Sequence, residues 1–249
     1  MTFHDHFSDA SAAYRQARPT YPDALFEWLA SASPGRGLAW DCGCGNGQAT
    51  VPLAAFFDKV IGTDASESQL EQAEPAPKVE YRVARAEASG LPGDSVDLCV
   101  VAQAAHWFDH EAFGAEVKRV LKPGGLLAYV TYGIHHVSAQ VDEIVGRYYV
   151  DIVGPYWPPE RIHVDQHYAN LPFPLPKIET PAFTIERDWT LDELLAYLAT
   201  WSASKGYYKA NARDPRDLVI DELAVAWGDV GSPRRVTWPL TVIAGRQVG

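Results

Sequence analysis

Short apolar runs alternate with helical patterns through the first half of the chain. Strands are predicted over residues 37–41, 59–64, 79–83, 95–101 and 126–131. The fourth run, S-V-D-L-C-V-V, is almost continuously apolar, which suits a strand covered on both faces of its sheet. Helical patterns lie between the strands, and one of them begins after Asp109 and ends at a K-P-G-G stop. This alternation predicts an α/β fold with a doubly wound, mostly parallel sheet.

The second half of the chain is less regular. A helical pattern over residues 138–152 is followed by a proline- and aromatic-rich loop at 154–160. Residues 171–176, L-P-F-P-L-P, are predicted to be extended because a residue before proline is kept out of the helical region. We expect a single domain over residues 1–249, with an inserted substrate-capping region at about 133–176.

Three signals place elements near the end of the chain. Thr190 and Glu193 have the spacing of a capping box and predict a helix start. Asp214-Pro215 predicts a second start, with proline at the first helical position. Residues 234–244 alternate between apolar and polar positions, as expected for a closing strand.

Composition restricts the partners. The net charge of −11 and the lack of a basic stripe argue against nucleic acid, whose phosphates are bound by clusters of Lys and Arg. No apolar run reaches the ~18–20 residues of a membrane helix. The N-terminus lacks the order of a signal peptide, so we expect a cytoplasmic protein with a small-molecule substrate. Cys42, Cys44 and Cys99 supply too few ligands for a disulfide framework or a structural zinc, and no metal is expected.

The segment A-W-D-C-G-C-G-N-G-Q-A at residues 39–49 carries the candidate chemistry. It joins a strand to a helix, and Asp64 ends the next strand, seventeen positions after Gly47. This order is typical of a nucleotide-binding crevice at the carboxyl ends of parallel strands. Glycines allow a ligand close to the backbone, and an acid at the place of Asp64 accepts hydrogen bonds from ribose hydroxyls.

The loop favours one class of nucleotide ligand over another. Gly43 and Gly45 fit a dinucleotide fingerprint, but its third glycine position holds Gln48. Asp41 at the strand tip would repel a pyrophosphate and attract an ammonium group. A nucleoside with a cationic amino-acid tail therefore fits better, and S-adenosyl-L-methionine (SAM) is such a molecule.

Four ordered motifs extend this reading. W-D-C-G-C-G-N-G, I-G-T-D-A-S, R-A-E-A-S-G-L-P…S-V-D-L-C-V-V and R-V-L-K-P-G-G-L-L resemble those of the class I SAM-dependent methyltransferases, in the type 11 methyltransferase domain. The resemblance covers residues 37–132 and implies a Rossmann-like, seven-stranded, mostly parallel sheet with an inserted lid. With residues 7–22, 103–109 and 156–161, the chain also resembles the small-molecule branch related to trans-aconitate methyltransferases.

The resemblance implies a set of cofactor-binding residues. These are Asp41 for the methionine amino group, Gly43, Cys44 and Gly45 along the methionyl chain, Asp64 for the ribose, Ala65 and Gln69 near the adenosine, Ala86 and Glu87 at the adenine edge, Gln103 after the fourth strand, and Tyr14 and Arg18 in an N-terminal segment over the cofactor. Many relatives carry an acid where this chain has Arg85, which accepts no hydrogen bond. The adenine contact here would then fall to backbone groups.

The acceptor decides whether a base is needed. A carboxylate is ionised at neutral pH and needs none, whereas a hydroxyl or an ammonium needs a base, for which His106 is the candidate. An acceptor site is expected at Trp107, Tyr156, Trp157 and Arg161. Trp107 also suits a core position, and the other three residues also suit a lid that packs on itself. His135 and His136 are either ligand contacts or solvated loop residues, and we favour the second reading.

We therefore expect a SAM-dependent methyltransferase that moves a methyl group to an oxygen of a small molecule, a carboxylate or a hydroxyl, and leaves S-adenosyl-L-homocysteine. A SAM-binding module without catalysis remains an alternative, and a nicotinamide-dependent oxidoreductase is disfavoured by Asp41 and Gln48. Methylation of nucleic-acid bases is disfavoured because A-Q-A-A-H-W-F stands where an N-P-P-Y-type motif is expected.

Overall fold

The computed structural model describes residues 18–248 and divides the chain into two compact units. The described part of the sheet unit consists of Tyr21–Gly133, Ile162–Phe183 and residues 240–248. The described part of the helical unit consists of residues 18–20, Ile134–Arg161 and Thr184–Pro239. Each unit is described separately below. The predicted capping role of residues 133–176 stays a prediction, and its range is shared between the two units.

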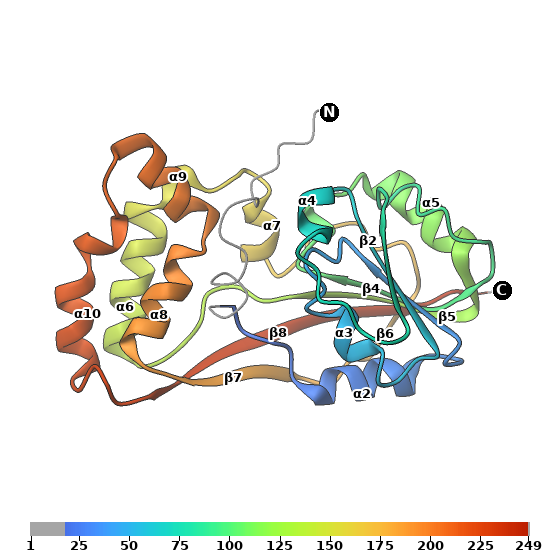
Figure 1. The fold of residues 1–249 in the computed structure, drawn as a ribbon, viewed down its shortest axis with the longest axis horizontal. Coiled ribbons are helices and arrows are strands. Elements are labelled where there is room, and N and C mark those ends of the chain that lie inside the picture. Colours follow the sequence, from blue (N-terminus) through green and yellow to red (C-terminus); the bar gives the residue numbers. More distant parts are fainter. Residues whose placement is uncertain (1–17, 249) are drawn as a thin grey trace. The chain divides into compact units, whose positions relative to one another are not determined.

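One mixed sheet forms the frame of the fold (Figure 1). Its strands are β1 (Leu38–Cys42), β2 (Lys59–Asp64), β3 (Val79–Val83), β4 (Val96–Ala102), β5 (Leu121–Thr131), β6 (Lys177–Ile178), β7 (Phe183–Trp189) and β8 (Arg234–Arg246). The order is β3-β2-β1-β4-β5-β8-β6, with β7 also paired to β8. The first five strands in this order are parallel, and β8 runs antiparallel to β5 and β6.

This topology confirms the predicted doubly wound, mostly parallel α/β fold. Within residues 18–248 the sheet has eight strands, one more than the seven implied by the family resemblance. β5 also begins earlier than predicted, since Leu121 already pairs with Val96 before a register shift. The K-P-G-G sequence that ends the preceding helix therefore lies in the irregular start of this strand.

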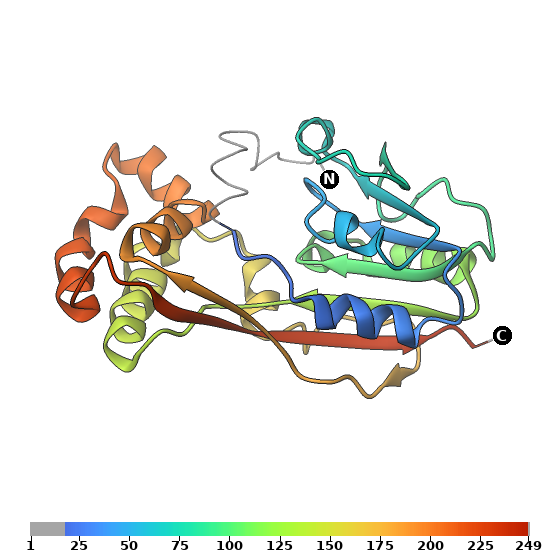
Figure 2. The same ribbon diagram turned by 60° about the horizontal axis from the view of Figure 1, so that its bottom comes forward.

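Helices cover both faces of the parallel strands in the sheet unit. They are α2 (Asp23–Ala32), α3 (Thr50–Leu53), α4 (Glu67–Leu70) and α5 (His110–Val120). Figure 2 shows α2 and α3 on one face and α5 on the other. Asp109 caps α5 as predicted, because its side chain accepts the backbone N–H of Ala112 at 3.1 Å.

The core of the sheet unit is dense in aromatic side chains. Trp40, Phe113 and Tyr129 are buried together between the sheet and α5. The chain after α7 (Arg161–Asp165) contributes more apolar residues to the same core, including Tyr168 and Leu171. The predicted extended segment at 171–176 is therefore anchored in this core, and Leu175 is buried there.

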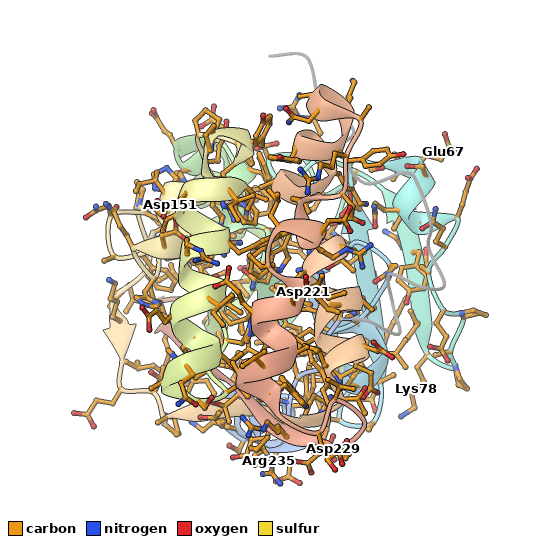
Figure 3. The ribbon with its side chains drawn as sticks, turned by 90° about the vertical axis from the view of Figure 1, so that its left-hand side faces the viewer. Glu67, Lys78, Asp151, Asp221, Asp229 and Arg235 are labelled. Carbon is orange, nitrogen blue, oxygen red and sulfur yellow. The ribbon has the colours of Figure 1, made fainter. Side chains whose placement is uncertain are left out.

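The helical unit contains α6 (Ala139–Arg147), a π-helical turn (Tyr148–Ile152), α8 (Leu191–Ala199), α9 (Ser202–Asn211) and α10 (Ile220–Trp227). The predicted capping box is present, since Thr190 and Glu193 bond each other's backbone N–H groups. Figure 3 looks onto these helices, with Asp221 on α10 and Asp151 beyond α6. None of the helices between residues 18 and 248 combines the length and apolar character of a membrane span.

Candidate active site

The register of the parallel strands brings the predicted acids to one edge of the sheet. Asp41 of β1 pairs with Gly62 of β2, and Asp64 of β2 pairs with Val83 of β3. The loops after these strands therefore leave the sheet at its carboxyl edge. In an open α/β sheet this edge is where ligands bind.

The glycine loop after β1 needs bare backbone. Gly43, Gly45 and Gly47 have φ angles of +70°, +54° and +92°, in the region that L side chains rarely adopt. The N–H groups of Gly43 and Cys44 both donate to the carbonyl of Thr63, at 2.8 and 3.0 Å. These two bonds tie the start of the loop to the end of β2.

Contact with the turn after β4 adds a second requirement for glycine. A Cβ on Gly43 would lie 2.6 Å from the Cβ of Ala104 and 3.2 Å from the ring of Phe108. Side-chain carbons do not approach this closely. The turn that carries residues 104–108 thus packs directly on the glycine loop.

Asp64 connects the glycine loop to the following turn. Its Oδ2 accepts the N–H of Gly45 at 2.8 Å, and its Oδ1 accepts the N–H of Ser66 at 2.9 Å. A carboxylate held by two backbone donors has a fixed orientation. The acid assigned to the ribose is therefore pre-oriented by the loop that would hold the rest of the ligand.

Asp41 is a buried carboxyl with one satisfied oxygen. Thr50 donates to its Oδ2 at 2.6 Å, while Oδ1 has no hydrogen-bond partner among residues 18–248. Burial raises the pKa of Asp41 to about 7, against the opposing effect of the Thr50 bond. A cationic group beside Oδ1 would satisfy the oxygen and favour its charge. Sequence reasoning did not identify Thr50, which follows the loop with no distinguishing signal.

The three cysteines are free thiols, of which Cys42 and Cys99 are buried and Cys44 is partly buried. Burial raises the pKa of Cys42, Cys44 and Cys99 well above the usual range for thiols. Within the described part of the chain, no group of three or more His, Cys, Asp or Glu side chains is placed to hold a metal ion. The thiol of Cys44 lies 3.6 Å from the carbonyl of Gly45 and belongs to the loop.

The other predicted cofactor residues in the sheet unit also lie at strand ends. Glu87 accepts the N–H of Asp109 at 3.0 Å, and Gln103, at φ +57°, bonds Thr131 and the carbonyl of Tyr132. Both side chains brace loops at this edge. Gln69 lies beside Gly45, Ala65 is exposed and Ala86 is buried. Their contacts with a cofactor stay predictions.

His106 is held by a residue that sequence reasoning did not identify. It lies on a short 3₁₀ turn, Ala105–Trp107, and its Nδ1 is 2.8 Å from the hydroxyl of Tyr168. Tyr168 is buried and has a φ of +59°, a strained conformation for an aromatic residue. The Trp107 ring contacts the imidazole at 4.7 Å between centroids and is 39% exposed, so it is not a core residue.

The remaining predicted residues belong to the helical unit or lie outside the described range. Arg161 stacks on Trp157 at 4.7 Å and donates to the hydroxyl of Tyr149 at 2.7 Å. Tyr156 lies elsewhere, against Tyr207 of α9. The structure thus brings Trp157 and Arg161 together without Tyr156.

Of the two N-terminal residues predicted to contact the cofactor, only Arg18 lies within the described residues. Arg18 lies over the ring of Tyr197 at 5.6 Å. Tyr14 lies outside the described residues. Contacts of either residue with a cofactor stay predictions.

Comparison with known proteins places this edge in a family. Residues 40–129 match a family described as a methyltransferase domain. A Dictyostelium discoideum protein named as a methyltransferase is 38% identical over 229 residues, which cover 90% of this chain and 87% of that protein. The chain belongs to the class I SAM-dependent methyltransferases. The chain is thus a SAM-dependent enzyme, as the glycine loop and the acids Asp41 and Asp64 predict.

A solved structure agrees with this assignment. A protein from Anaeromyxobacter dehalogenans, described as a type II methyltransferase, is 48% identical and has a TM-score of 0.88, with 93% of this chain and 98% of that chain covered. A Saccharomyces cerevisiae protein named as a SAM-dependent methyltransferase is 26% identical, with 92% of each chain covered. The narrower resemblance to trans-aconitate methyltransferases stays a prediction.

The residues of this methyltransferase fit the cofactor. Oδ1 of Asp41 is buried without a partner in the described chain, and the loop beside it has no side chains at Gly43, Gly45 and Gly47. The ammonium group of SAM would pair with this oxygen. Its methionyl chain could lie close to the glycine backbone. Asp64 is already oriented by the N–H groups of Gly45 and Ser66, and a carboxylate is the kind of acceptor that ribose hydroxyls need.

Proposed function

We propose that this methyltransferase transfers the methyl group of SAM to an oxygen atom of a small-molecule acceptor, a carboxylate or a hydroxyl. When bound, the cofactor supplies a methyl group activated on a sulfonium. The chain's own residues would orient the two reactants and exclude water, and such alignment lowers a barrier by ~7–11 kcal/mol. We assign the ammonium to Asp41, the methionyl chain to residues 43–45 and the ribose to Asp64.

The observation that carries this proposal is the contact between the His106 turn and the glycine loop. Ala104 and Phe108 flank the turn, and both lie against Gly43. His106 therefore sits on an element that borders the loop that would hold the methionyl chain. Its Nδ1 lies 2.8 Å from the hydroxyl of Tyr168, and this contact orients the imidazole ring.

His106 has a role only for some acceptors. A hydroxyl must lose a proton as it is methylated, and a histidine in place to take it contributes typically ~10²–10⁴-fold in rate. A carboxylate has no proton to lose, so the imidazole would only position it. We further assign acceptor contacts to Trp107, Tyr156, Trp157 and Arg161.

Charge supports a small-molecule acceptor over nucleic acid. The chain carries a net charge of −11, and acidic side chains such as Asp151 and Asp221 lie on the outer face of the helical unit (Figure 3). A phosphate backbone is bound by basic surfaces that give binding its salt dependence. The alternative of a SAM-binding module without catalysis is decided by turnover.

The test is methyl transfer from labelled SAM to a panel of small carboxylic acids and small hydroxyl compounds. We expect turnover of at least one member. If that acceptor is a hydroxyl compound, His106→Asn should lower kcat by about 10²–10⁴-fold at unchanged SAM affinity. If it is a carboxylate, the same variant should change kcat by less than about tenfold.

His136→Asn is the matched control, since His136 is exposed and pairs with Asp142 at 3.4 Å. It should behave as wild type. Tight SAM binding without turnover of any panel member, by wild type at several pH values, would contradict the proposal and favour the non-catalytic module.

A further inference from the structure

The end of α7 brings Tyr168 to the turn that carries His106. The N–H of Tyr168 donates to the carbonyl of His163 at 2.7 Å. The N–H of the preceding His167 donates to the carbonyl of Val164 at 2.9 Å. These two bonds form a Schellman motif, in which a helix ends on a left-handed residue. The motif and the His106 turn both belong to the sheet unit.

This helix end is made without glycine. His167 and Tyr168 have φ angles of +53° and +59°, a region that glycine adopts readily and that other residues adopt only with steric strain. Strain of this kind persists where the surrounding structure holds it, and it gathers at functional sites. The strained turn delivers the hydroxyl of Tyr168 to a position 2.8 Å from Nδ1 of His106.

A second tyrosine in the same core shows that the contact is specific. The Tyr168 ring is 1% exposed and meets the ring of Tyr129 edge-on, with 6.3 Å between their centroids. The hydroxyl of Tyr129 is also buried, but it has no hydrogen-bond partner among residues 18–248. Burial in this core therefore does not by itself give a tyrosine a partner. The pairing with His106 is a feature of Tyr168.

The chemistry of the pair indicates which group donates. A phenol, with an ordinary pKa of about 10, is a better acid than the N–H of a neutral imidazole, and an imidazole nitrogen is a better base than a phenol oxygen. Donation from the Tyr168 hydroxyl to Nδ1 of His106 is therefore the stronger of the two bonds that this geometry allows. With Nδ1 as the acceptor, the proton of the neutral ring is on Nε2.

We propose that Tyr168 is a positioning residue of this methyltransferase, which holds the neutral His106 ring in the tautomer with its proton on Nε2 and so keeps the ring from acting as a base. A neutral imidazole has one lone pair in the plane of the ring, and Tyr168 occupies it. The inference rests on the proposed function. It makes Tyr168 select for acceptors that have no proton to lose.

Such an acceptor reacts without proton transfer. An anionic oxygen of the acceptor forms a bond to the methyl carbon, the bond from that carbon to the sulfonium breaks, and its electron pair stays on sulfur. The negative charge of the acceptor and the positive charge of the sulfonium cancel. A hydroxyl acceptor would instead release a proton that His106, paired in this way, has no lone pair to take.

Nitrogen-15 NMR of the histidine rings tests the inference without an acceptor. The full chain would be labelled at its eight histidines, with S-adenosyl-L-homocysteine in excess, and His106→Asn would identify the His106 signals by their loss. At pH 8, above the ordinary pKa of a histidine, we expect the wild-type ring to have a bare Nδ1 and a protonated Nε2. In Tyr168→Phe the excess of this tautomer should fall about fivefold, because a typical hydrogen bond shifts an equilibrium by this much.

Tyr129→Phe is the matched control, because it removes a buried hydroxyl from the same core. It should keep the wild-type tautomer ratio. The two tyrosine variants are used only if their thermal midpoints and their affinities for S-adenosyl-L-homocysteine match wild type. If Tyr168→Phe does not meet this criterion, the tautomer of the wild-type ring decides by itself.

Four results would overturn the inference. Three come from NMR: a wild-type ring with its proton on Nδ1, an unchanged tautomer ratio in Tyr168→Phe, or an equal change in Tyr129→Phe. The fourth is a loss of about 10²–10⁴-fold in kcat for His106→Asn on a panel acceptor, since it would show that His106 is a base. None of these results contradicts methyl transfer to an oxygen. If wild type binds SAM and turns over no panel member, the proposed function fails, while the NMR comparison still decides whether Tyr168 sets the tautomer.

Discussion

At the scale of single residues, Asp41 shows a conflict between stability and binding. A carboxyl that is buried at the tip of β1 is easier to keep protonated than charged. Its native pKa of about 7 lies well above the ordinary value of 3.8. The protein thus keeps a group that costs stability at neutral pH, and the cost is understandable if a cationic ligand needs the charge.

This conflict predicts a pH-dependent difference between wild type and Asp41→Asn. As pH rises from 4 to 7, the unfolded chain loses the Asp41 proton first, so the native state becomes less favoured. Wild type should lose roughly 4 kcal/mol of unfolding free energy relative to the variant over this range, at about 1.4 kcal/mol per pKa unit. Urea unfolding of the ligand-free proteins at several pH values measures the difference.

Above pH about 7 the difference should become constant, because the carboxyl is then ionised in both states. SAM affinity of Asp41→Asn should be at least about tenfold weaker than that of wild type at pH 8, since an amide carries no charge for the ammonium. A stability difference that does not vary between pH 4 and 7 would show that Asp41 has an ordinary pKa.

Sequence reasoning could assign roles to residues within a motif but not to residues whose contacts cross the fold. Asp41 was assigned because it precedes the glycine loop at the tip of a strand, and Asp64 because it ends the next strand. Tyr168 could not, since it reaches His106 across 62 residues of chain. His135 was wrongly expected to be solvated, because its burial depends on the bridge between its neighbour His136 and Thr237. No local sequence pattern indicates this bridge.

At the scale of elements, the glycine loop is defined by backbone shape and by space. Gly47 has a φ of +92°, and a Cβ there would overlap the hydroxyl of Tyr81 on β3. Gly90 has a comparable φ of +69°, but nothing lies within 4 Å of where its Cβ would be. Comparing the two glycines therefore separates the free-energy cost of a positive φ from the cost of steric overlap at a new Cβ.

Gly47→Ala should therefore be worse than Gly90→Ala in two respects. Both variants should lose about 1 kcal/mol of unfolding free energy from the positive φ, and Gly47→Ala should lose about 1–3 kcal/mol more from overpacking. Only Gly47→Ala should weaken SAM binding, by at least about tenfold. Denaturant unfolding and calorimetry measure both effects. Equal losses in the two variants would mean that Tyr81 moves aside easily.

Side-chain caps determine which helix starts could be predicted from the sequence. α5 and α8 begin with side-chain caps from Asp109 and Thr190, and both starts were expected. α2 and α9 begin at Pro22 and Trp201 without a side-chain cap bond, and neither was foreseen. α2 is held by a buried apolar face that includes Leu25 and Leu29, and such tertiary packing is not visible in a cap pattern.

At the scale of the whole molecule, the division into two units separates the cofactor residues from much of the predicted acceptor site. The described residues assigned to the methionyl chain and the ribose all belong to the sheet unit, whereas Trp157 and Arg161 belong to the helical unit. Chains of this size often unfold in more than one step. A ligand that binds one unit should then stabilise that unit first.

We therefore expect S-adenosyl-L-homocysteine to raise the thermal transition of the sheet unit. At a ligand concentration 100 times Kd, mass action adds about 2.7 kcal/mol, which corresponds to roughly 5–10 °C for a chain of this length. Asp64→Ala should abolish this shift at the same concentration. Asp58→Ala, at the exposed opposite end of β2, should keep it. Scanning calorimetry with and without ligand measures the shift. An undiminished shift in Asp64→Ala would show that this carboxylate is not part of the cofactor site, because truncating a side chain that the ligand does not contact leaves its affinity unchanged.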